Sequence, residues 1–395
     1  MTAELDFVPF DCDNHYYEAI DAFTRHLDPK DGPRCVQWAQ IEGRQYQVIG
    51  GQVSRVVTNP TFDPISPAGA MHDYFRGNPD GKHPIEFLTQ REPIRPEYRD
   101  HDARIATLDR QGISKIWLFP TLGMLYEEIL KHDPEGVGIM FTAFNRWLAE
   151  DWGFDYQDRI FAGPYISLAS PEWACNELDW ALAQGARVVV MRAAAPTTAH
   201  GQRTPFDTIY DPFWARVNEA GITVVIHAGD SGNSSNGYAN DSFSAQFSGV
   251  GWKPSIKAFN IERAAQDFII SSIFEKLFDR FPNVRMASVE NGSSFLADAC
   301  TKLTSTAKKM PRYFTEDPVE SLRQNWWINP FWEDDVQEVS EIMGTDHVIF
   351  GSDWPHIEGM PNPLDYVSEL KAFSPQDQRR ILLDNVTALN TPRPL

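Results

Sequence analysis

Residues 186–193 read ARVVVMRA, residues 211–221 read DPFWARVNEAG, and residues 222–229 read ITVVIHAG. The first and third stretches are nearly continuous in apolar residues, as expected for strands that are covered on both faces. The middle stretch has apolar residues at i, i+3 and i+4 and closes on Gly221, which is typical of a helix and its C-cap. Together the three stretches predict a βαβ unit of a parallel sheet.

The same alternation recurs along the whole chain of 395 residues. Eight β-rich runs can be counted, which are LDFVPFD (5–11), ISKIWLFP (113–120), FAGPYISL (161–168), ARVVVMRA (186–193), ITVVIHAG (222–229), VRMASVEN (284–291), NWWINPFW (325–332) and HVIFGSDW (347–354). Segments with helical spacing lie between them, at 95–112, 135–152, 170–185 and 211–221. This pattern predicts an α/β fold of the (β/α)8 TIM-barrel type, with a doubly wound sheet and a second domain as the alternative.

The first crossover is unusually long, because the first run ends at residue 11 and the second begins at residue 113. A helix with two short loops needs far fewer residues. We therefore expect a single barrel over 1–395 with an inserted subdomain at 19–104, and a hairpin within it at 45–57. Because βα loops lie at the catalytic face of a barrel, the insertion would form a lid over the active site. A second long loop, rich in Ser, Gly and Asn, is expected at 229–258.

The formal net charge of -20 argues against a nucleic-acid partner and against an acidic membrane surface, since both require clustered Lys and Arg. The charge is uneven, however. Residues 25–115 carry a net charge of +1, and the rest of the chain carries -21. Such an Arg-bearing segment could receive an anionic substrate, or it could be an ordinary solvated surface of mixed charge.

The four cysteines show no metal-binding spacing and are expected to be reduced thiols. The N-terminus MTAELDFVPF has no basic region followed by an apolar stretch, and no apolar run approaches the ~20 residues that span a bilayer. The sequence therefore predicts a soluble cytoplasmic protein without a membrane partner.

Acidic and imidazole side chains follow several predicted strands at their carboxyl ends, where barrel enzymes hold their chemistry. They are Asp11, Asp13, His15, His227, Glu290 and Asp353. Carboxylates mixed with imidazoles are a ligand set for Zn2+, Mn2+ or Fe2+, and Asp13 and His15 are spaced to chelate one ion together. Each residue also has a plain structural explanation: a turn or hydrogen bond for Asp11 and Asp353, a core histidine for His227, and a helix cap for Glu290.

Four motifs carry a resemblance to a known family. DNH at 13–15, VVIHAGDSG at 224–232, ENGSSF at 290–295 and GSDWPHIEG at 351–359 resemble the amidohydrolase superfamily, in particular its amidohydrolase-related branch of metal-dependent hydrolases and decarboxylases. The resemblance covers nearly the whole chain and implies the TIM barrel. It also implies that relatives are commonly homo-oligomers.

The resemblance assigns metal-ligand positions to Asp13, His15, His227 and Asp353, with Asp353 also acting as a proton shuttle. Three residues depart from the family pattern. Asp13 stands where a His is usual, and Arg192 stands where some relatives have a carbamylated Lys that bridges two metals. Glu290 stands where decarboxylases use a His. The site could hold one or two ions, with Asp13, Glu18 and Glu290 as carboxylates for a second ion.

These positions predict an enzyme in which a metal activates water, Asp353 accepts and returns the proton, and Arg192, His356 and Glu290 position the substrate. Arg192 and His356 could equally have structural roles. Tyr16 and Tyr17 are possible oxyanion donors.

The expected reaction is hydrolysis of an acyl bond (ester, amide, or thioester such as acyl-coenzyme A) in a small molecule that is bulky and apolar. The phosphates of such a thioester could meet cations of the insertion, namely Arg76, Lys82, Arg91, Arg95 and Arg99. The alternatives are non-oxidative decarboxylation of an aromatic or enoic acid and, from another class, a catalytically silent barrel that binds a ligand.

Overall fold

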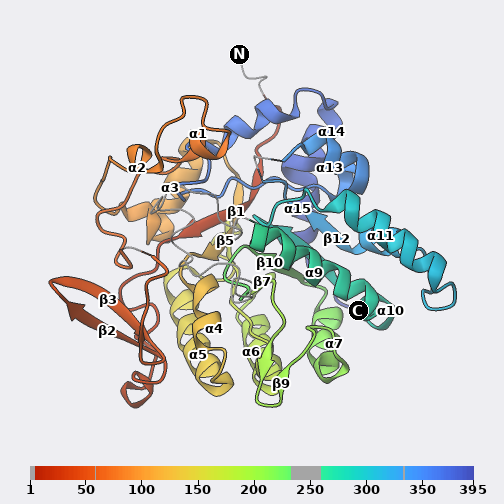
Figure 1. The fold of residues 1–395 in the computed structure, drawn as a ribbon. Helices are drawn as coiled ribbons and strands as arrows, with labels where there is room; N and C mark the ends of the chain where they lie inside the picture. The colour runs from red at the N-terminus through yellow and green to blue at the C-terminus, as the bar shows by residue number, and fades with distance from the viewer. Residues whose placement is uncertain (1–4, 58, 233–258, 332–333) are drawn as a thin grey trace.

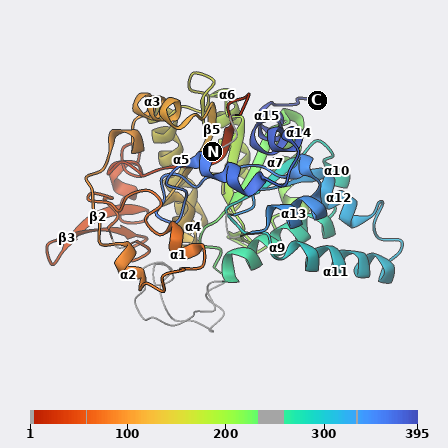
Figure 2. The ribbon, with the colours of Figure 1, turned by 90° about the horizontal axis from the view of Figure 1, so that it is seen from above.

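The computed structural model describes residues 5–57, 59–232, 259–331 and 334–395, and it has the α/β fold that the sequence predicts. Helices lie around the outside of a set of central strands (Figure 1, Figure 2). The strands are β1 (Phe10–Tyr16), β2 (Val36–Ile41), β3 (Arg44–Ile49), β4 (Gln52–Val53), β5 (Lys115–Pro120), β6 (Ile160–Ala162), β7 (Val188–Arg192), β8 (Thr197–Thr198), β9 (Gly201–Gln202), β10 (Thr223–His227), β11 (Arg285–Val289) and β12 (Trp326–Ile328).

The helices include the four that the periodicity predicts, at 101–111, 134–151, 171–183 and 211–220. In chain order, the α-helices of the described residues are α1 (His72–Phe75), α2 (Pro84–Phe87), α3 (His101–Gln111), α4 (Gly123–Leu130), α5 (Pro134–Asp151), α6 (Pro171–Ala183), α7 (Asp211–Ala220), α9 (Asn260–Phe274), α10 (Leu277–Arg280), α11 (Leu296–Lys309), α12 (Pro318–Asn325), α13 (Val336–Met343), α14 (Pro375–Arg379) and α15 (Asn385–Asn390). Local signals set their ends: Asp100 caps the start of α3, and Gly112 and Gly221 adopt positive φ after α3 and α7.

The central strands pair in parallel in two groups, β1-β5-β6 and β7-β10-β11-β12. Isolated parallel bridges extend both groups, and they join Tyr165 to Val190, Ile328 to Val348, and Asn14 to Trp354. The eighth predicted run, 347–354, is therefore an extended segment with bridges on both sides rather than a regular strand. As a result, each of the eight runs has a partner on either side.

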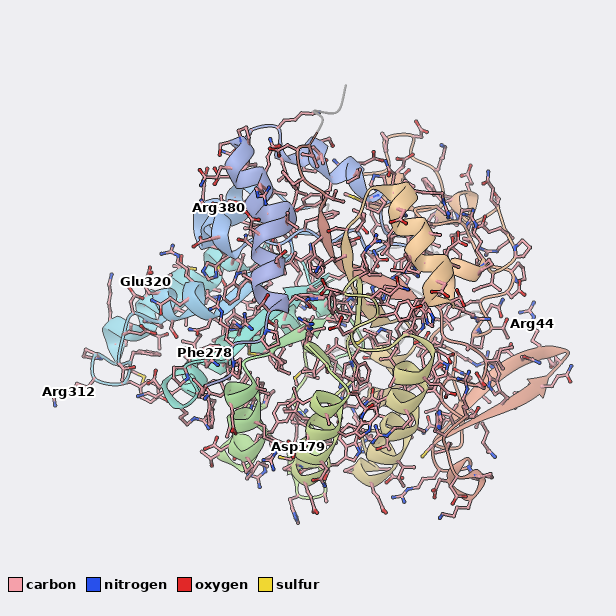
Figure 3. The ribbon with its side chains drawn as sticks, turned by 180° about the vertical axis from the view of Figure 1, so that it is seen from behind. Arg44, Asp179, Phe278, Arg312, Glu320 and Arg380 are labelled. Carbon is pink, nitrogen blue, oxygen red and sulfur yellow. The ribbon has the colours of Figure 1, made fainter. Side chains whose placement is uncertain are left out.

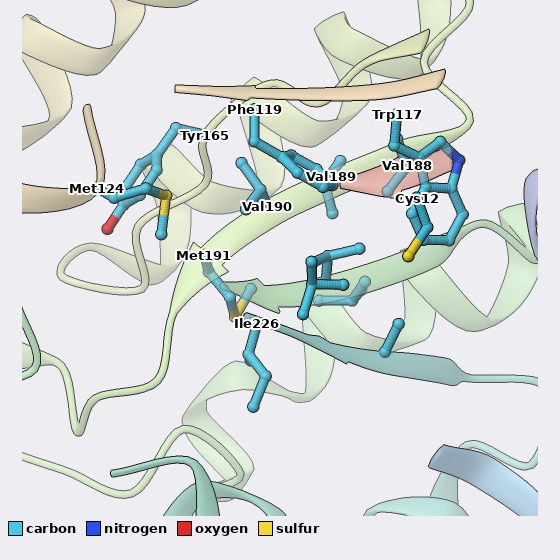
Figure 4. Packing of buried hydrophobic residues seen from close by; sticks show 14 of the residues in the cluster. Cys12, Trp117, Phe119, Met124, Tyr165, Val188, Val189, Val190, Met191 and Ile226 are labelled. Carbon is cyan, nitrogen blue, oxygen red and sulfur yellow. The ribbon is translucent and has the colours of Figure 1, made fainter. Parts of the chain in front are cut away.

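The strands are buried along their length, as their nearly continuous apolar sequences predict. Every residue of β7, β10 and β11 is buried. Their apolar side chains belong to one large hydrophobic cluster, part of which Figure 4 shows around Trp117, Val188 and Met191. This rigid core fixes the strand ends from which the polar residues project.

Residues 19–104 form a sequence of short elements between β1 and α3. The hairpin expected at 45–57 is present but short, since β3 and β4 pair only through Val48–Val53 and Ile49–Gln52. A longer hairpin, β2–β3, turns at Glu42 and Gly43 and projects from the body of the protein (Figure 1). Its polar sequence gives little β signal, so the sequence did not predict it.

Of the loop expected at 229–258, residues 233–258 lie outside the described part of the chain. Within the described ranges, no helix is both long and apolar enough to cross a lipid bilayer.

Candidate metal centre and active site

Asp11 and Asp13, near the end of β1, have different surroundings. The pairing of β1 with β5 is irregular between Asp11 and Asn14, so these residues do not follow simple alternation. Asp11 accepts hydrogen bonds from the Ser352 backbone N–H, the Ser352 hydroxyl and the Asn14 amide at 2.6–2.9 Å. Asp11 therefore ties β1 to the eighth run, while Asp13 and His15 point elsewhere.

Asp13 and His15 meet residues from the ends of β10 and β11. His227 Nε2 lies 3.2 Å from Asp13 Oδ1 and 3.3 Å from Glu290 Oε2, and His15 Nε2 lies 3.2 Å from Asp13 Oδ1. One ligand atom from each of these four residues lies within 4.8 Å of the others. The fold thus brings together residues that are up to 277 positions apart in sequence.

A second, overlapping group contains His15, Glu290, Asp353 and His356. Asp353 Oδ1 lies 3.3 Å from His15 Nε2 and 2.6 Å from His356 Nδ1. The His15 and His356 rings are stacked, with centroids 3.9 Å apart, whereas the His15 and His227 rings are nearly perpendicular at 77°. Five of the predicted metal ligands (Asp13, His15, His227, Glu290 and Asp353) therefore lie together with His356, which the sequence analysis expected to position the substrate.

Two of these donors adopt backbone conformations that non-glycine residues rarely have. Glu290 and Asp353 have φ of 58° and 56°. The Asp353 N–H is held by the Asp13 carbonyl at 2.9 Å, and the Glu290 N–H by the Asn329 side chain at 3.3 Å. Such outliers cluster at functional sites, because only a rigid surrounding structure maintains them.

Burial and mutual repulsion shift the pKa values of the site. Burial raises the pKa of Asp353 well above its usual range, and the nearby Glu290 and Glu358 carboxylates raise it further. Burial and Asp13 likewise raise the pKa of Glu290. Burial alone would raise the pKa of Asp13, but the His15 and His227 imidazoles beside it outweigh burial and hold that pKa well below its usual range.

Several of the buried donor atoms lack a hydrogen-bond partner. They are His15 Nε2, both carboxylate oxygens of Asp353 and His356 Nδ1. Buried polar atoms are normally paired, and a cation between these atoms would satisfy them together. Carboxylate oxygens and imidazole nitrogens suit a divalent transition-metal ion, and the donor set therefore fits such an ion.

Glu18 and Arg192, also predicted for the site, lie apart from both groups. Glu18 Oε1 accepts the backbone N–H groups of Leu122 and Gly123 at 2.7 and 3.0 Å, and so holds the start of α4. Arg192, at the end of β7, donates to Glu128 at 2.7 Å and to the Asp230 carbonyl at 2.9 Å. These contacts correspond to the structural role that the sequence left open for Arg192.

The two tyrosines expected as oxyanion donors are also engaged elsewhere. The Tyr17 hydroxyl donates to the Pro355 carbonyl at 3.0 Å, although its ring lines the cavity described below. Tyr16 is buried between Trp147 and Trp152.

Sequence reasoning missed two residues beside the centre. Glu358 lines the cavity and, after burial, is among the charges that raise the pKa values of Glu290 and Asp353, while burial and Asp13 raise the pKa of Glu358 itself. Its place in GSDWPHIEG, directly after the motif, was the available signal.

The second missed residue is Arg104, whose guanidinium is fully buried below the end of β1. It donates to the His15 carbonyl at 2.6 Å, to Asn14 Oδ1 at 2.7 Å and to the Glu97 carbonyl at 2.7 Å. Sequence offered no signal for it, since an Arg on a helix is usually exposed.

A cavity of about 900 Å³ opens onto the centre. His15, His227, Glu290 and His356 line it, so both donor groups are accessible from it. Most of the other walls are apolar and come largely from residues 19–104, namely Ile20, Val56, Val57, Phe62, Ile65 and Leu88, with Met124, Leu125, Ile261 and Ile357 from other parts of the chain. The cavity therefore combines a polar base with an apolar wall, as small-molecule sites do.

Comparison with known proteins agrees with this geometry. A family model described as Amidohydrolase matches residues 11–389. An amidohydrolase of Mycobacterium avium subsp. paratuberculosis K-10 is 42% identical, with a TM-score of 0.91 over 98% of this chain and 100% of that chain. No protein with a curated description matches the chain.

Two more distant structures share the fold. One is 5-carboxyvanillate decarboxylase from Novosphingobium aromaticivorans DSM 12444, complexed with manganese and 4-hydroxy-3-methoxy-5-nitrobenzoic acid (15% identity, TM-score 0.62, covering 98% of this chain and 96% of that chain). The other is 2,6-dihydroxybenzoate decarboxylase from Rhizobium (18% identity, TM-score 0.55, covering 73% of this chain and 87% of that chain).

Proposed function

The chain belongs to the amidohydrolase family, and from this premise we propose that it is a metal-dependent hydrolase of an acyl bond in a bulky, largely apolar small molecule. We infer that the eight strand runs close into a (β/α)8 barrel. Three bridges, Tyr165–Val190, Ile328–Val348 and Asn14–Trp354, support closure, because they supply the neighbours that the regular ladders lack. Residues 19–104 would then be an insertion that forms a lid over the cavity.

The metal would be held by Asp13, His15, His227 and Asp353, with Glu290 beside them. When bound, a divalent ion supplies Lewis acidity, which activates water and polarises the acyl carbonyl. Zn, Mn and Fe all accept this donor set, and the manganese in the structure of 5-carboxyvanillate decarboxylase makes Mn the first ion to test.

Asp353 is the best-placed group to move a proton. Its carboxylate is buried, its two oxygens have no hydrogen-bond partner, and burial raises its pKa, which favours the uptake of a proton by this group. His356 lies 2.6 Å from Asp353 Oδ1 and can keep the carboxylate in position. His356 is in turn anchored by Thr121 at 2.9 Å.

The observation that favours hydrolysis is the group of carboxylates at the base of the cavity, where Glu290 and Glu358 line the wall and Asp13 and Asp353 lie beside them. Within the described ranges, no Lys or Arg side chain forms an ion pair with Asp13, Glu290 or Asp353. Charge on a bound ion is thus already balanced by these carboxylates and by Glu358 nearby. A neutral acyl group can enter this part of the cavity, whereas these carboxylates would repel a free substrate carboxylate.

The apolar walls favour a bulky acyl or aromatic group, and the cavity volume is near the upper end of the ~300–1,000 Å³ typical of ligand pockets. A coenzyme A thioester is less well supported than an ester or amide. Arg76, Lys82 and Arg95 pair with Glu369, Asp80 and Glu92. Arg99 donates to three carbonyls. An anionic group could bind Arg91, which lies in the cavity wall, and Arg44, which lies at the tip of the β2–β3 hairpin (Figure 3).

Decarboxylation of an aromatic acid is the second candidate, because two structural neighbours are decarboxylases. The test is a two-part screen of the Mn-loaded protein and its Asp353→Asn variant. One part measures release of acid from aryl and long-chain esters, amides and thioesters, and the other measures CO2 from hydroxybenzoic acids. Acid release that Asp353→Asn abolishes supports the proposal, whereas CO2 release without acid release replaces it with the second candidate. A protein that binds no metal would indicate the silent barrel instead.

A further inference from the structure

We propose that the substrate carries a free carboxylate at the end remote from the scissile acyl bond, and that the Arg91 guanidinium and the Ser66 hydroxyl bind this carboxylate at the mouth of the cavity. The inference rests on the proposed function and deepens it by naming the substrate class. That class is an ester or amide with an apolar middle and an anionic far end. Neither Arg91 nor Ser66 belongs to the donor groups at the base of the cavity.

The cavity has a buried base and an exposed mouth. His15 and His227, at the base, are buried, and so are Phe62 and Leu125 in the apolar wall. Arg91 also lines the cavity, but its side chain is exposed, which places it at the mouth. A substrate that reaches the donors at the base and Arg91 at the mouth must therefore lie along the apolar wall.

An antiparallel bridge within residues 19–104 holds this part of the mouth in place. The backbones of Ile65 and Glu92 exchange two hydrogen bonds, each of 2.8 Å. Continuing this register by one residue places Ser66 opposite Arg91, and residues at opposite positions of an antiparallel pair are direct neighbours. Ser66 lines the same cavity. The fold thus brings a cation and a hydroxyl together at one point of the wall.

The Ser66 hydroxyl has no partner in the described part of the protein. Its side chain is buried, at 4% exposure, and its Oγ makes no hydrogen bond. Buried hydroxyls are normally paired, and each can donate one hydrogen bond. Because Ser66 lines the cavity, a bound ligand can supply the missing acceptor. This unpaired donor points to a ligand independently of Arg91.

Arg91 is likewise without an acidic partner among the described residues, since the acids close to it are used elsewhere. Glu86 accepts a backbone N–H at the start of α2 at 2.8 Å, and Glu92 pairs with Arg95 at 2.5 Å. Asp63, an acid of the same wall, accepts a backbone N–H at 3.3 Å on the other side of the bridge. The Arg91 charge is therefore available to a ligand.

A carboxylate matches these donors better than a phosphate does. The planar guanidinium can bind both oxygens of one carboxylate, and the Ser66 hydroxyl adds a third donor. A phosphate monoester carries a charge of about −1.5 to −2 near neutrality, which one guanidinium does not balance. Arg44 also lines the cavity, but it lies at the tip of the β2–β3 hairpin and is not placed by the bridge.

The test compares two esters on the Mn-loaded full chain. One is mono-4-nitrophenyl sebacate, whose far end is a free carboxylate, and the other is its methyl ester, whose far end is neutral. We expect kcat/KM for nitrophenol release to favour the free carboxylate by about 5-fold, the effect of an exposed ion pair. Arg91→Gln should remove most of this preference through a higher KM for the anionic ester, and Ser66→Ala should reduce it.

Lys30→Gln is the matched control. It also removes one positive charge from residues 19–104, but Lys30 does not line the cavity and pairs with Asp28 at 2.8 Å, so the preference should remain. Added salt should weaken the preference of the parent, because exposed charges are screened. Asp353→Asn serves as the blank for release that does not depend on the metal centre.

The ratio of the two substrates is measured on one protein sample, so partial misfolding of a variant lowers both rates and leaves the ratio unchanged. Equal kcat/KM for the two esters in the parent, or a preference that Arg91→Gln leaves intact, would overturn this inference while the hydrolysis itself upholds the proposed function. Release of nitrophenol from neither ester would overturn both. The two failures are therefore distinguishable.

Discussion

Replacing Arg104 by methionine should destabilise the protein and weaken metal binding at once. Met fills much of the space between Trp152 and Trp354, over which the guanidinium lies at 5.4 and 4.7 Å. It cannot donate to the His15 carbonyl, Asn14 Oδ1 or the Glu97 carbonyl. The substitution therefore isolates the loss of hydrogen bonds from the loss of volume.

The size of the effect follows from these three acceptors. An acceptor left unsatisfied in a buried site costs ~1–3 kcal/mol, and the half-buried Glu97 carbonyl costs less because water can reach it. Burial of the cation itself, which lowers the pKa of Arg104 to about 9, offsets part of the gain in the parent protein. We expect a loss of about 4 kcal/mol in the free energy of unfolding, and about half of this for Arg104→Lys.

The expected effect of Arg104→Met on metal affinity is separate from its effect on stability. Arg104 donates a hydrogen bond to the carbonyl of His15. Groups that orient a metal-binding residue through a hydrogen bond typically contribute 10- to 100-fold to metal affinity. We expect a loss of this size for Mn2+.

The assays are urea denaturation of metal-free protein, followed by tryptophan fluorescence, and competition of Mn2+ with a chelator. Arg110→Met on the same helix is the control. Among the described residues Arg110, which is exposed, donates a side-chain hydrogen bond only to the Thr107 hydroxyl, so its replacement should change either quantity little. An Arg104→Met protein that unfolds within about 1 kcal/mol of the parent and binds Mn2+ equally well would refute this reasoning.

Three further outcomes are expected. Burial raises the pKa of Glu18 to about 7, so the folded state keeps a proton that the unfolded state releases, and stability should fall by up to ~3 kcal/mol between pH 4.5 and 7. Glu18→Gln should remove the contribution of Glu18 and so reduce the fall in stability over this range, which thermal midpoints of the two proteins will show. Gly351→Ala should abolish Mn2+ binding by equilibrium dialysis, because the new Cβ would lie 2.5 Å from the Asp13 Cβ, whereas Gly32→Ala should bind normally. Chelation should lower the melting temperature of the parent by several degrees but leave that of His227→Ala unchanged, and an equal shift in both proteins would place the stabilising metal elsewhere.

Local sequence was sufficient to predict the buried strands and the helices that end in a glycine cap. The strands around Val188, Val224 and Met286 are buried on both faces, so their apolar runs are visible without knowledge of their neighbours. The helices ending at Gly112 and Gly221 were equally clear, since a cap acts within one turn. Where polar residues dominate, as in the β2–β3 hairpin, local pattern gave no such signal.

The candidate site was only partly predictable. Strand ends located Asp13, His15, His227 and Asp353 at one edge of a parallel sheet, and the structure brings them together. Sequence could not tell that Glu18 would turn away to hold α4, because that depends on where Leu122 lies in space.

By itself, the sequence determined the α/β fold class, the family resemblance and the residue types available for metal binding, because strand burial and motif spacing are properties of the chain alone. Tertiary structure decided which of these residues meet and which of their atoms face one another. Only folding brings Thr121 to His356 and Arg104 to the His15 carbonyl. These contacts are formed across the sheet between distant segments, and hydrogen-bond direction and ring angle exist only once those segments are packed together.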